Sequence, residues 1–337
     1  MSSYFTACSH TIQRKKKTDE YERQDTKMNV YRPEGSLIKN PENRDYLASR
    51  AGLERALEKQ IILEAPAILC DRDFSLHISV SPHIRAIIPR DEVQYTKNGE
   101  QVKDIAILTR VGKPVCFKVI GFSEQEGEPT VILSRRAAQE ECMLNYISAL
   151  SPGDIIPAKI THLESFGAFV DIGCGIISLL SIDCISVSRI SHPSARLNVG
   201  QSVYTVVKST ENDRIYVSMR ELLGTWEENA ALFSEGQTVR GVIRGVEDYG
   251  IFVELTPNLA GLAEYREGVA VGQTAAIYIK SILPDRMKIK LIIIDVHDAP
   301  LCPEPTEYFI DPEKRTHMNS WIYSPECSKR VIRTDFV

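Results

Sequence analysis

Long apolar segments are absent from this sequence of 337 residues. No window approaches the roughly 18 uncharged apolar residues of a membrane-spanning helix, and the N-terminal stretch MSSYFTACSHTIQRKKK has no apolar core of signal-peptide length. A membrane protein is therefore excluded, and secretion is not expected. An excess of positive charge is also absent, because 40 Lys and Arg residues face 45 Asp and Glu residues, for a net charge of −5. Any binding to nucleic acid must therefore depend on a local patch.

Enzyme and metal signatures are missing too. The chain has no GxxxxGK[ST], GxGxxG, HExxH or GxSxG motif, so we predict a non-enzymatic protein without cofactor or metal. We interpret His162 and Glu164 as solvated turn residues rather than as an acid–base pair. The eight cysteines contain no CxxC pair. We therefore expect buried thiols and a cytoplasmic location.

The chain is repetitive. The segment GDIIPAKITHLESFGAFVDI, which begins at Gly153, aligns without a gap with GQTVRGVIRGVEDYGIFVEL, which begins at Gly236. A second shared element reads VGKPVCFKV, VGQSVYTVV and VGQTAAIYI, starting at Val111, Val199 and Val271. Three modules of roughly 60 to 75 residues each are therefore predicted.

Short alternating strands rich in Val, Ile and aromatic residues, punctuated by glycines, fill each module. A small closed barrel buries five such strands best, because closure removes the sheet edges. We therefore predict a mainly β fold of three tandem five-stranded barrels joined by short helices. Trp226 is expected to pack on a barrel.

The same patterns indicate domain boundaries. Met28 is a candidate start of the folded protein, and Asn40 is a candidate N-cap. The predicted parts are a disordered basic extension at 1–27, an N-terminal helix within 28–60, barrels at 61–136, 153–218 and 236–295, helical linkers at 137–152 and 219–235, and a Pro-rich tail at 296–337 with a candidate hairpin around Asp311-Pro312.

The motif SFGAFVDI and its copy DYGIFVEL carry the most informative side chains. Strict alternation would place the two rings of each motif on opposite faces of a strand, but a bulge at Gly167 or Gly250 would turn both outward. The alternative is that one or both rings belong to the core. Because the spacing occurs twice, we favour a platform on which each stacked base contributes about 1–3 kcal/mol. Its predicted rings are Phe166, Phe169, Tyr249 and Phe252.

Bases stacked on such a platform require cations nearby for their phosphates. Lys288 and Lys290 alternate in the sequence KIK and so share one strand face. The alternative is that the cations are scattered surface charges, since residues 153–222 hold six basic and seven acidic residues. The predicted phosphate contacts are Lys208, Arg214, Arg244, Lys280, Lys288 and Lys290.

The repeated pattern, in which Phe/Tyr-Gly-x-Phe-Val-acid follows a Gly-led strand, resembles the RNA-binding domain named after bacterial ribosomal protein S1. The resemblance is strong for 153–222, good for 236–295 and fainter for 61–136, and it includes linkers such as LSRRAAQEE. It implies OB-fold barrels that bind single-stranded RNA. The implied stacking rings are the four already named, and the implied basic residue before the last strand is Arg214 or Lys288.

Some family positions are altered in this chain. A histidine that the domain often has on its third strand falls at Ser181 and Glu264, and an acidic position falls at Thr210. Module one reads DFSLHISVSPH, with Phe74 and His77 but no FGxF. We therefore expect module one to bind RNA weakly or not at all. By analogy with longer family members, it is a candidate site for docking on the small ribosomal subunit.

These features together predict an RNA-binding protein linked to translation, with single-stranded RNA, most plausibly mRNA, as its partner and no membrane association. One alternative is a ribosome-associated scaffold whose aromatic faces bind proteins. A second alternative is an RNA-binding accessory of an RNA-processing enzyme, because similar domains are appended to nucleases.

Overall fold

The computed structural model describes residues 31–96, 100–125, 128–211, 214–298 and 306–336. The chain divides into two compact units, one of Met1–Leu150 with Ile172–Ile176 and the other of Ser151–Asp171 with Ile177–Val337. The predicted extension at 1–27 and the candidate start Met28 lie outside the described residues. Among the described residues, no helix has the length and apolar character needed to cross a membrane.

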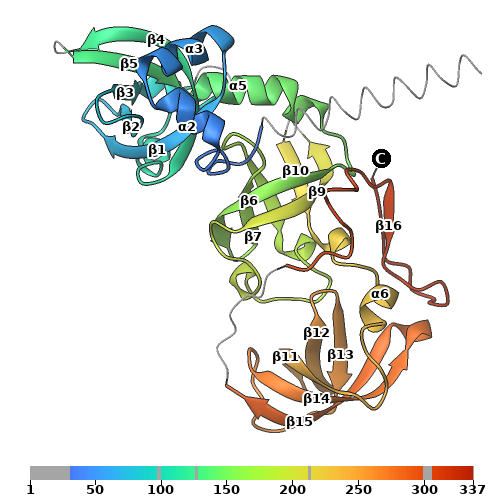
Figure 1. Cartoon of the computed structure of the whole chain (residues 1–337). Coiled ribbons are helices and arrows are strands. Elements are labelled where there is room, and N and C mark those ends of the chain that lie inside the picture. Colours follow the sequence, from blue (N-terminus) through green and yellow to red (C-terminus); the bar gives the residue numbers. More distant parts are fainter. Residues whose placement is uncertain (1–30, 97–99, 126–127, 212–213, 299–305, 337) are drawn as a thin grey trace, which may run out of the picture. The chain divides into compact units, whose positions relative to one another are not determined.

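Three closed five-stranded barrels make up the fold, which confirms the predicted class (Figure 1). In each barrel the third strand pairs in parallel with the fifth. The first barrel contains β1 (Leu63–Cys70), β2 (Leu76–Ile78), β3 (Arg85–Ile88), β4 (Pro114–Gln125) and β5 (Glu128–Ser134). The second contains β6 (Ile155–Glu164), β7 (Gly167–Asp171), β8 (Ile177–Ser181), β9 (Ser202–Glu211) and β10 (Arg214–Ser218). The third contains β11 (Thr238–Glu247), β12 (Gly250–Thr256), β13 (Leu259–Ala263), β14 (Thr274–Leu283) and β15 (Lys288–His297).

The helices are short. Two of them, α2 (Pro41–Leu47) and α3 (Arg50–Lys59), stand where one was predicted within 28–60. The Asn40 side chain caps α2 as expected, but Ser49 adopts an extended conformation and caps a second helix by accepting from the Gly52 amide. The other helices are α4 (Asp104–Leu108), α5 (Arg135–Asn145) and α6 (Trp226–Ala230).

A buried ion pair lies inside the first unit. The Arg135 guanidinium donates to the Glu34 carboxylate at 2.7 and 3.1 Å, and Arg110 lies 3.5 Å from the same carboxylate. Burial by itself would raise the pKa of Glu34, but the charges and hydrogen bonds of these arginines outweigh it and hold that pKa below its ordinary value of 4.5.

A second set of buried contacts joins the two barrels of the second unit. Asn258, in the turn between β12 and β13, is fully buried. Its Nδ2 donates to the carbonyl oxygens of Arg220 at 2.7 Å and Gly224 at 2.8 Å, and its Oδ1 accepts from the Val187 amide at 3.0 Å. Because Val187 and Arg220 follow strands of the second barrel, this single side chain hydrogen-bonds the third barrel to the second.

Residues 306–336 form a C-terminal strap on these two barrels. The Tyr308 hydroxyl accepts from the Tyr204 amide at 2.8 Å, and the Thr316 carbonyl accepts from the Ile155 amide at 2.8 Å. Both contacts fix the strap to the second barrel.

The hairpin of the strap lies further along the chain than predicted. Asp311 begins a turn, in which its carbonyl accepts from the Lys314 amide. The hairpin instead pairs β16 (Ser320–Ile322) with β17 (Arg333–Asp335). Trp321, on the first strand of this hairpin, is buried in the core of the third barrel.

Two strap rings complete the core of the third barrel. Trp321 and Tyr323 are buried in one cluster with Trp226, which confirms the packing role predicted for Trp226. The Tyr323 hydroxyl donates to the Asn258 carbonyl, and the Tyr323 carbonyl accepts from the Trp226 amide at 2.9 Å. The strap therefore contributes to both barrels of the second unit.

Removing the buried strap ring should destabilise the protein. We expect Trp321→Ala to lower the free energy of unfolding by about 3–5 kcal/mol, because it leaves a cavity in the core. The matched control is Ile322→Ala on the same strand, whose side chain is 48% exposed and whose loss should stay within about 0.5 kcal/mol. Urea unfolding followed by far-ultraviolet circular dichroism measures both. Equal midpoints for the two variants would contradict the packing.

The buried Glu34 should make the first unit sensitive to acid. Because the folded-state pKa of Glu34 is depressed, its stabilisation is present above its ordinary pKa of 4.5 and is lost as pH falls through the folded value. Glu34→Gln should remove this dependence and cost about 3–5 kcal/mol at neutral pH, since it leaves Arg135 without its buried counter-charge. Unfolding measured as a function of pH for both proteins tests this. Parallel pH profiles would contradict it.

Candidate nucleic-acid interface

The two rings of the second barrel lie on its outer surface. Phe166 stands in the turn before β7 and is 54% exposed, while Phe169 lies on β7 and is half-buried. Ala168 and Val170, on either side of Phe169, point into the core, so the alternation of the strand turns Phe169 outward. The two rings meet edge to face, with centroids 6.0 Å apart. They offer an apolar surface that solvent reaches.

The bulge predicted at Gly167 is wrong in position. The irregularity lies one strand earlier, in β6 between Ile160 and His162, where Thr161 is the extra residue. Phe166 faces outward because it precedes β7 and so is not bound by the alternation of that strand. Gly167 has a different role, because a Cβ there would lie 2.4 Å from the Leu180 carbonyl oxygen of β8.

The third barrel repeats this arrangement. Tyr249 is 71% exposed in the turn before β12, and Phe252 is 37% exposed on β12. Their rings also meet edge to face, at 6.1 Å. The irregularity again lies in the preceding strand, between Ile243 and Gly245, so the predicted bulge at Gly250 is wrong for the same reason.

Paired residues on neighbouring strands extend the second-barrel site. Phe169 stands opposite His162 on β6 and Leu179 on β8, and Leu179 stands beside Tyr216 on β10. We call this row of four residues the outer rung. The imidazole of His162 lies nearly parallel to the Phe169 ring, at 23° and 6.4 Å between centroids. The interpretation of His162 as a turn residue is therefore wrong, because it lies on a strand beside the stacking ring.

The outer rung of the third barrel has the same frame and different side chains. Phe252 stands opposite Gly245 and Leu262, and Leu262 stands beside Lys290 on β15. Lys290, one of the predicted phosphate contacts, therefore occupies the position of Tyr216. Sequence reasoning missed His162 and Tyr216, although the gapless repeat aligns His162 with Gly245, and the closing strands IYVS and IKLI align Tyr216 with Lys290.

Most of the predicted cations are exposed. Lys208 lies on β9 with its Nζ 3.4 Å from the Cys184 Sγ, and Arg214 begins β10 two residues before Tyr216. In the third barrel the predicted cations that are exposed lie on the last two strands and are Lys280, Lys288 and Lys290.

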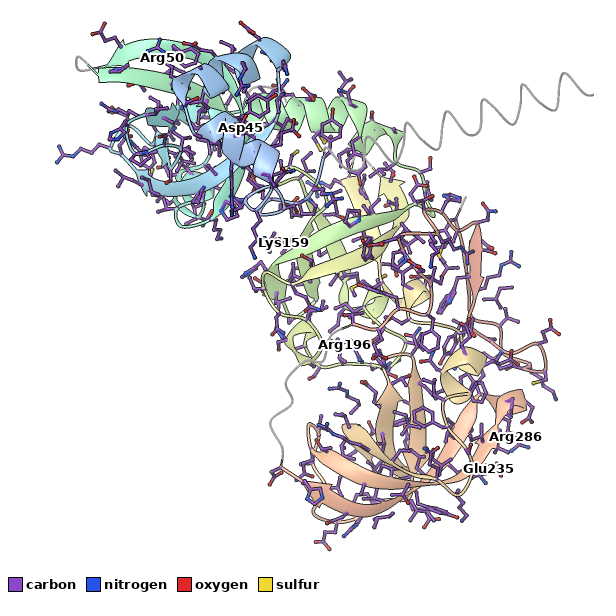
Figure 2. The ribbon with its side chains drawn as sticks, viewed as in Figure 1. Asp45, Arg50, Lys159, Arg196, Glu235 and Arg286 are labelled. Atoms are coloured by element: carbon purple, nitrogen blue, oxygen red, sulfur yellow. The ribbon has the colours of Figure 1, made fainter. Side chains whose placement is uncertain are left out.

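Arg244 differs from the other predicted cations. Its guanidinium donates to the Glu254 carboxylate at 2.8 and 3.1 Å, and Arg196 donates to the same carboxylate at 2.9 and 2.7 Å. Figure 2 shows Arg196 where the two barrels of the second unit meet. The Arg244 donors thus bind a carboxylate that is only 7% exposed. We therefore leave Arg244 out of the candidate phosphate contacts.

In the first barrel, charged side chains contact the residues that correspond to the two exposed rings. Leu69 stands opposite His77, and Phe74 precedes His77 by the same three residues that separate Phe166 from Phe169. The Arg90 guanidinium covers the Phe74 ring at 4.7 Å from its centroid, and the His77 Nε2 lies 3.0 Å from the Asp71 carboxylate. Neither ring is presented as an open stacking face.

Within the ranges that the structure describes, no three His, Cys, Asp or Glu side chains are close enough to hold a metal ion. The six described cysteines form no disulfide, and four of them are buried.

Comparisons with known proteins identify one family and several curated relatives. The family described as the S1 RNA binding domain matches residues 150–220, which include the second barrel. The small ribosomal subunit protein bS1 homolog of Bacillus cereus is 30% identical over 228 residues, covering 64% of this chain and 55% of that protein. The bS1 protein of Staphylococcus aureus is 34% identical over 173 residues, covering 49% of this chain and 43% of that protein.

Two more proteins are similar to this chain. The bS1 protein of Rhizobium meliloti is 29% identical and covers 54% of this chain, which spans 32% of that protein. A crystal structure of a multidomain protein with nucleic acid binding domains from Streptococcus pneumoniae covers 75% of this chain and 77% of its own at 15% identity, with a TM-score of 0.23. The chain thus spans between about a third and about half of the length of the curated relatives it matches.

The shared carboxylate between Arg196 and Arg244 should matter for stability. Glu254→Gln should lower the free energy of unfolding by about 3 kcal/mol, because it leaves two buried guanidinium groups without their counter-charge. Glu247→Gln, at an exposed position on β11, is the control and should change it by less than about 0.5 kcal/mol. Thermal unfolding followed by circular dichroism compares them. A Glu254→Gln protein as stable as the control would contradict the structural role.

Proposed function

We propose that the second unit of this chain, which belongs to the S1 family, binds single-stranded RNA. We propose further that this RNA is mRNA, and that binding takes place in the cytoplasm in a process linked to translation. The observation that carries this proposal is the pair of exposed rings on each of two barrels in one compact unit. Every base has a π-face, so a ring platform accepts any sequence. We therefore propose binding with low sequence preference and without catalysis.

The charge distribution supports the same proposal. The overall charge of −5 would repel a polyanion, so attraction must be local. On the third barrel, Lys288 and Lys290 alternate outward along β15, and Lys290 shares the outer rung with Phe252. On the second barrel, Arg214 and Lys208 are the nearest counterparts by sequence position. A base on the rings would therefore have cations on other strands of the same barrel for its phosphates.

Binding of both barrels to one RNA strand should raise the affinity for that strand. Asn258 and the strap connect them within one unit. Once one platform has bound, the second encounters the same strand at high effective concentration. Affinity for a long strand should therefore exceed the affinity of either barrel alone.

For the first barrel we propose a weak role in RNA binding or none, because Arg90 covers Phe74 and Asp71 binds His77. Docking on the small ribosomal subunit remains our proposal for this barrel. Exposed apolar side chains on β1, Ile68 at 61% and Leu69 at 53%, favour contact with a protein there.

Removing the four rings tests the proposed function. We expect the Phe166/Phe169/Tyr249/Phe252 quadruple alanine variant to remain folded, because its rings are on the surface, and to lose at least roughly 30-fold in affinity for oligouridylate, since two or more stacked bases are lost. The control is Tyr278→Ala, which removes an exposed ring from the middle of β14, where it pairs with Thr238 at the start of β11. Fluorescence anisotropy measures binding, and circular dichroism checks the fold.

Two outcomes would count against RNA as the ligand. A folded quadruple variant that keeps its affinity would show that the rings do not carry binding. Affinity that stays constant as salt rises would favour the protein-scaffold alternative, because phosphate contacts release counterions and an apolar docking face does not. Catalysis on RNA by a separate subunit would be consistent with the accessory alternative and would appear only when that subunit is added.

A further inference from the structure

The two outer rungs differ at two positions, and at one of them the fold leaves the choice of side chain free. Opposite the stacking phenylalanine, the second barrel has His162 and the third has Gly245. The second difference, Tyr216 against Lys290, lies at the far end of the rung, beyond the leucine. The features around the first position are repeated: the ring in the turn, the strand ring, the bulge in the preceding strand and the leucine on the next strand, which is Leu179 or Leu262. At this position the difference is therefore local to one side chain.

We propose that His162 is a third base-stacking ring of the second barrel, and that Gly245 leaves the third barrel with a smaller platform. This inference rests on the proposed binding of RNA and adds to it a residue that sets how unequal the two barrels are. The expected ligand of His162 is an unpaired nucleobase next to the base on Phe169.

The geometry of His162 suits this role. The side chain is 62% exposed and its ring lies nearly parallel to that of Phe169, so both rings offer flat surfaces of similar orientation. The Nε2 lies 2.8 Å from a carboxylate oxygen of Glu164, two residues along the same strand. A ring held on two sides loses little freedom when a base stacks on it.

The fold does not require a glycine at 245. A Cβ there would lie 3.5 Å from Cδ2 and 3.8 Å from Cβ of Phe252, which is ordinary van der Waals contact, and the residue has no left-handed conformation to maintain. This contrasts with Gly250, where φ is +152° and a Cβ would lie 2.6 Å from the Ala263 carbonyl oxygen. A ring can therefore be installed at 245 without strain.

Reciprocal exchange at these two positions is the experiment. His162→Gly is made in the full chain that also carries Tyr249→Ala and Phe252→Ala, so that only the second platform remains. Gly245→His is made in the chain with Phe166→Ala and Phe169→Ala. The probe is fluorescein-labelled oligouridylate of about 12 nucleotides, within the span of one OB-fold barrel.

We expect His162→Gly to weaken binding by roughly five-fold or more and Gly245→His to strengthen it by a similar factor, the lower end of what one stacked base contributes. His162→Phe separates stacking from charge: it should keep the affinity, whereas His162→Lys should lose it. Unchanged affinity in His162→Gly, or loss in His162→Phe with retention in His162→Lys, would overturn the inference.

Failure of this inference is distinguishable from failure of the proposed function. If His162→Gly binds as before while the four-ring alanine variant loses RNA, the platform is real and His162 is outside it. If the four-ring variant itself keeps RNA, the platform is wrong and the exchange has no ligand to report on. Circular dichroism of each variant confirms that the exchange at an exposed position leaves the fold unchanged.

Discussion

The close approach of the second and third strands in the second and third barrels is the constraint on which the candidate site depends. At the first residue of the second strand, the carbonyl of the third strand occupies the space of a side chain: Leu180 faces Gly167, and Ala263 faces Gly250. Only glycine fits, so the strand begins at that residue and the aromatic residue before it is left in the turn. This is why one ring stands in the turn and the other, three residues later, on the strand, and why both are on the surface.

One frame thus supports three different surfaces. In the second barrel, rings or an aliphatic side chain occupy every position of the outer rung. In the third barrel, a glycine and a lysine replace two of these rings. In the first barrel, Arg90 lies over the ring in the turn, and the position on the strand holds a histidine bound to Asp71. Because the barrel core is built from the alternate residues, these exchanges leave the fold intact. Divergence of the outer face at constant architecture allows the modules to bind different partners.

Buried contacts connect the second and third barrels to each other. Asn258 places its amide in the linker between them, and the strap adds Trp321 and Tyr323 to the core of one barrel while it hydrogen-bonds the other. The cluster of Arg196, Arg244 and Glu254 lies at the same junction. One predicted cation, Arg244, is bound to Glu254 there and so is not available to a ligand. Charges at this junction contribute to structure, and those at the free ends of β10 and β15 remain for binding.

The barrel fold, the repeat and the exposure of the four candidate rings could be predicted from the sequence alone, because strand alternation and the duplicated FGxF spacing are local patterns. Pairing between strands is not local, and what depended on it had to come from the tertiary structure. The extra residue, Thr161, lies in a strand whose pairing partner is decided by closure of the barrel. For this reason the position of His162 on the outer rung could not be predicted from the sequence. The loss of Arg244 to Glu254, and the position of the strap hairpin at Trp321 rather than Asp311, were decided by which groups share a buried space. Spacing along a chain identifies side chains of the right kind, but only packing determines which of them a ligand can reach.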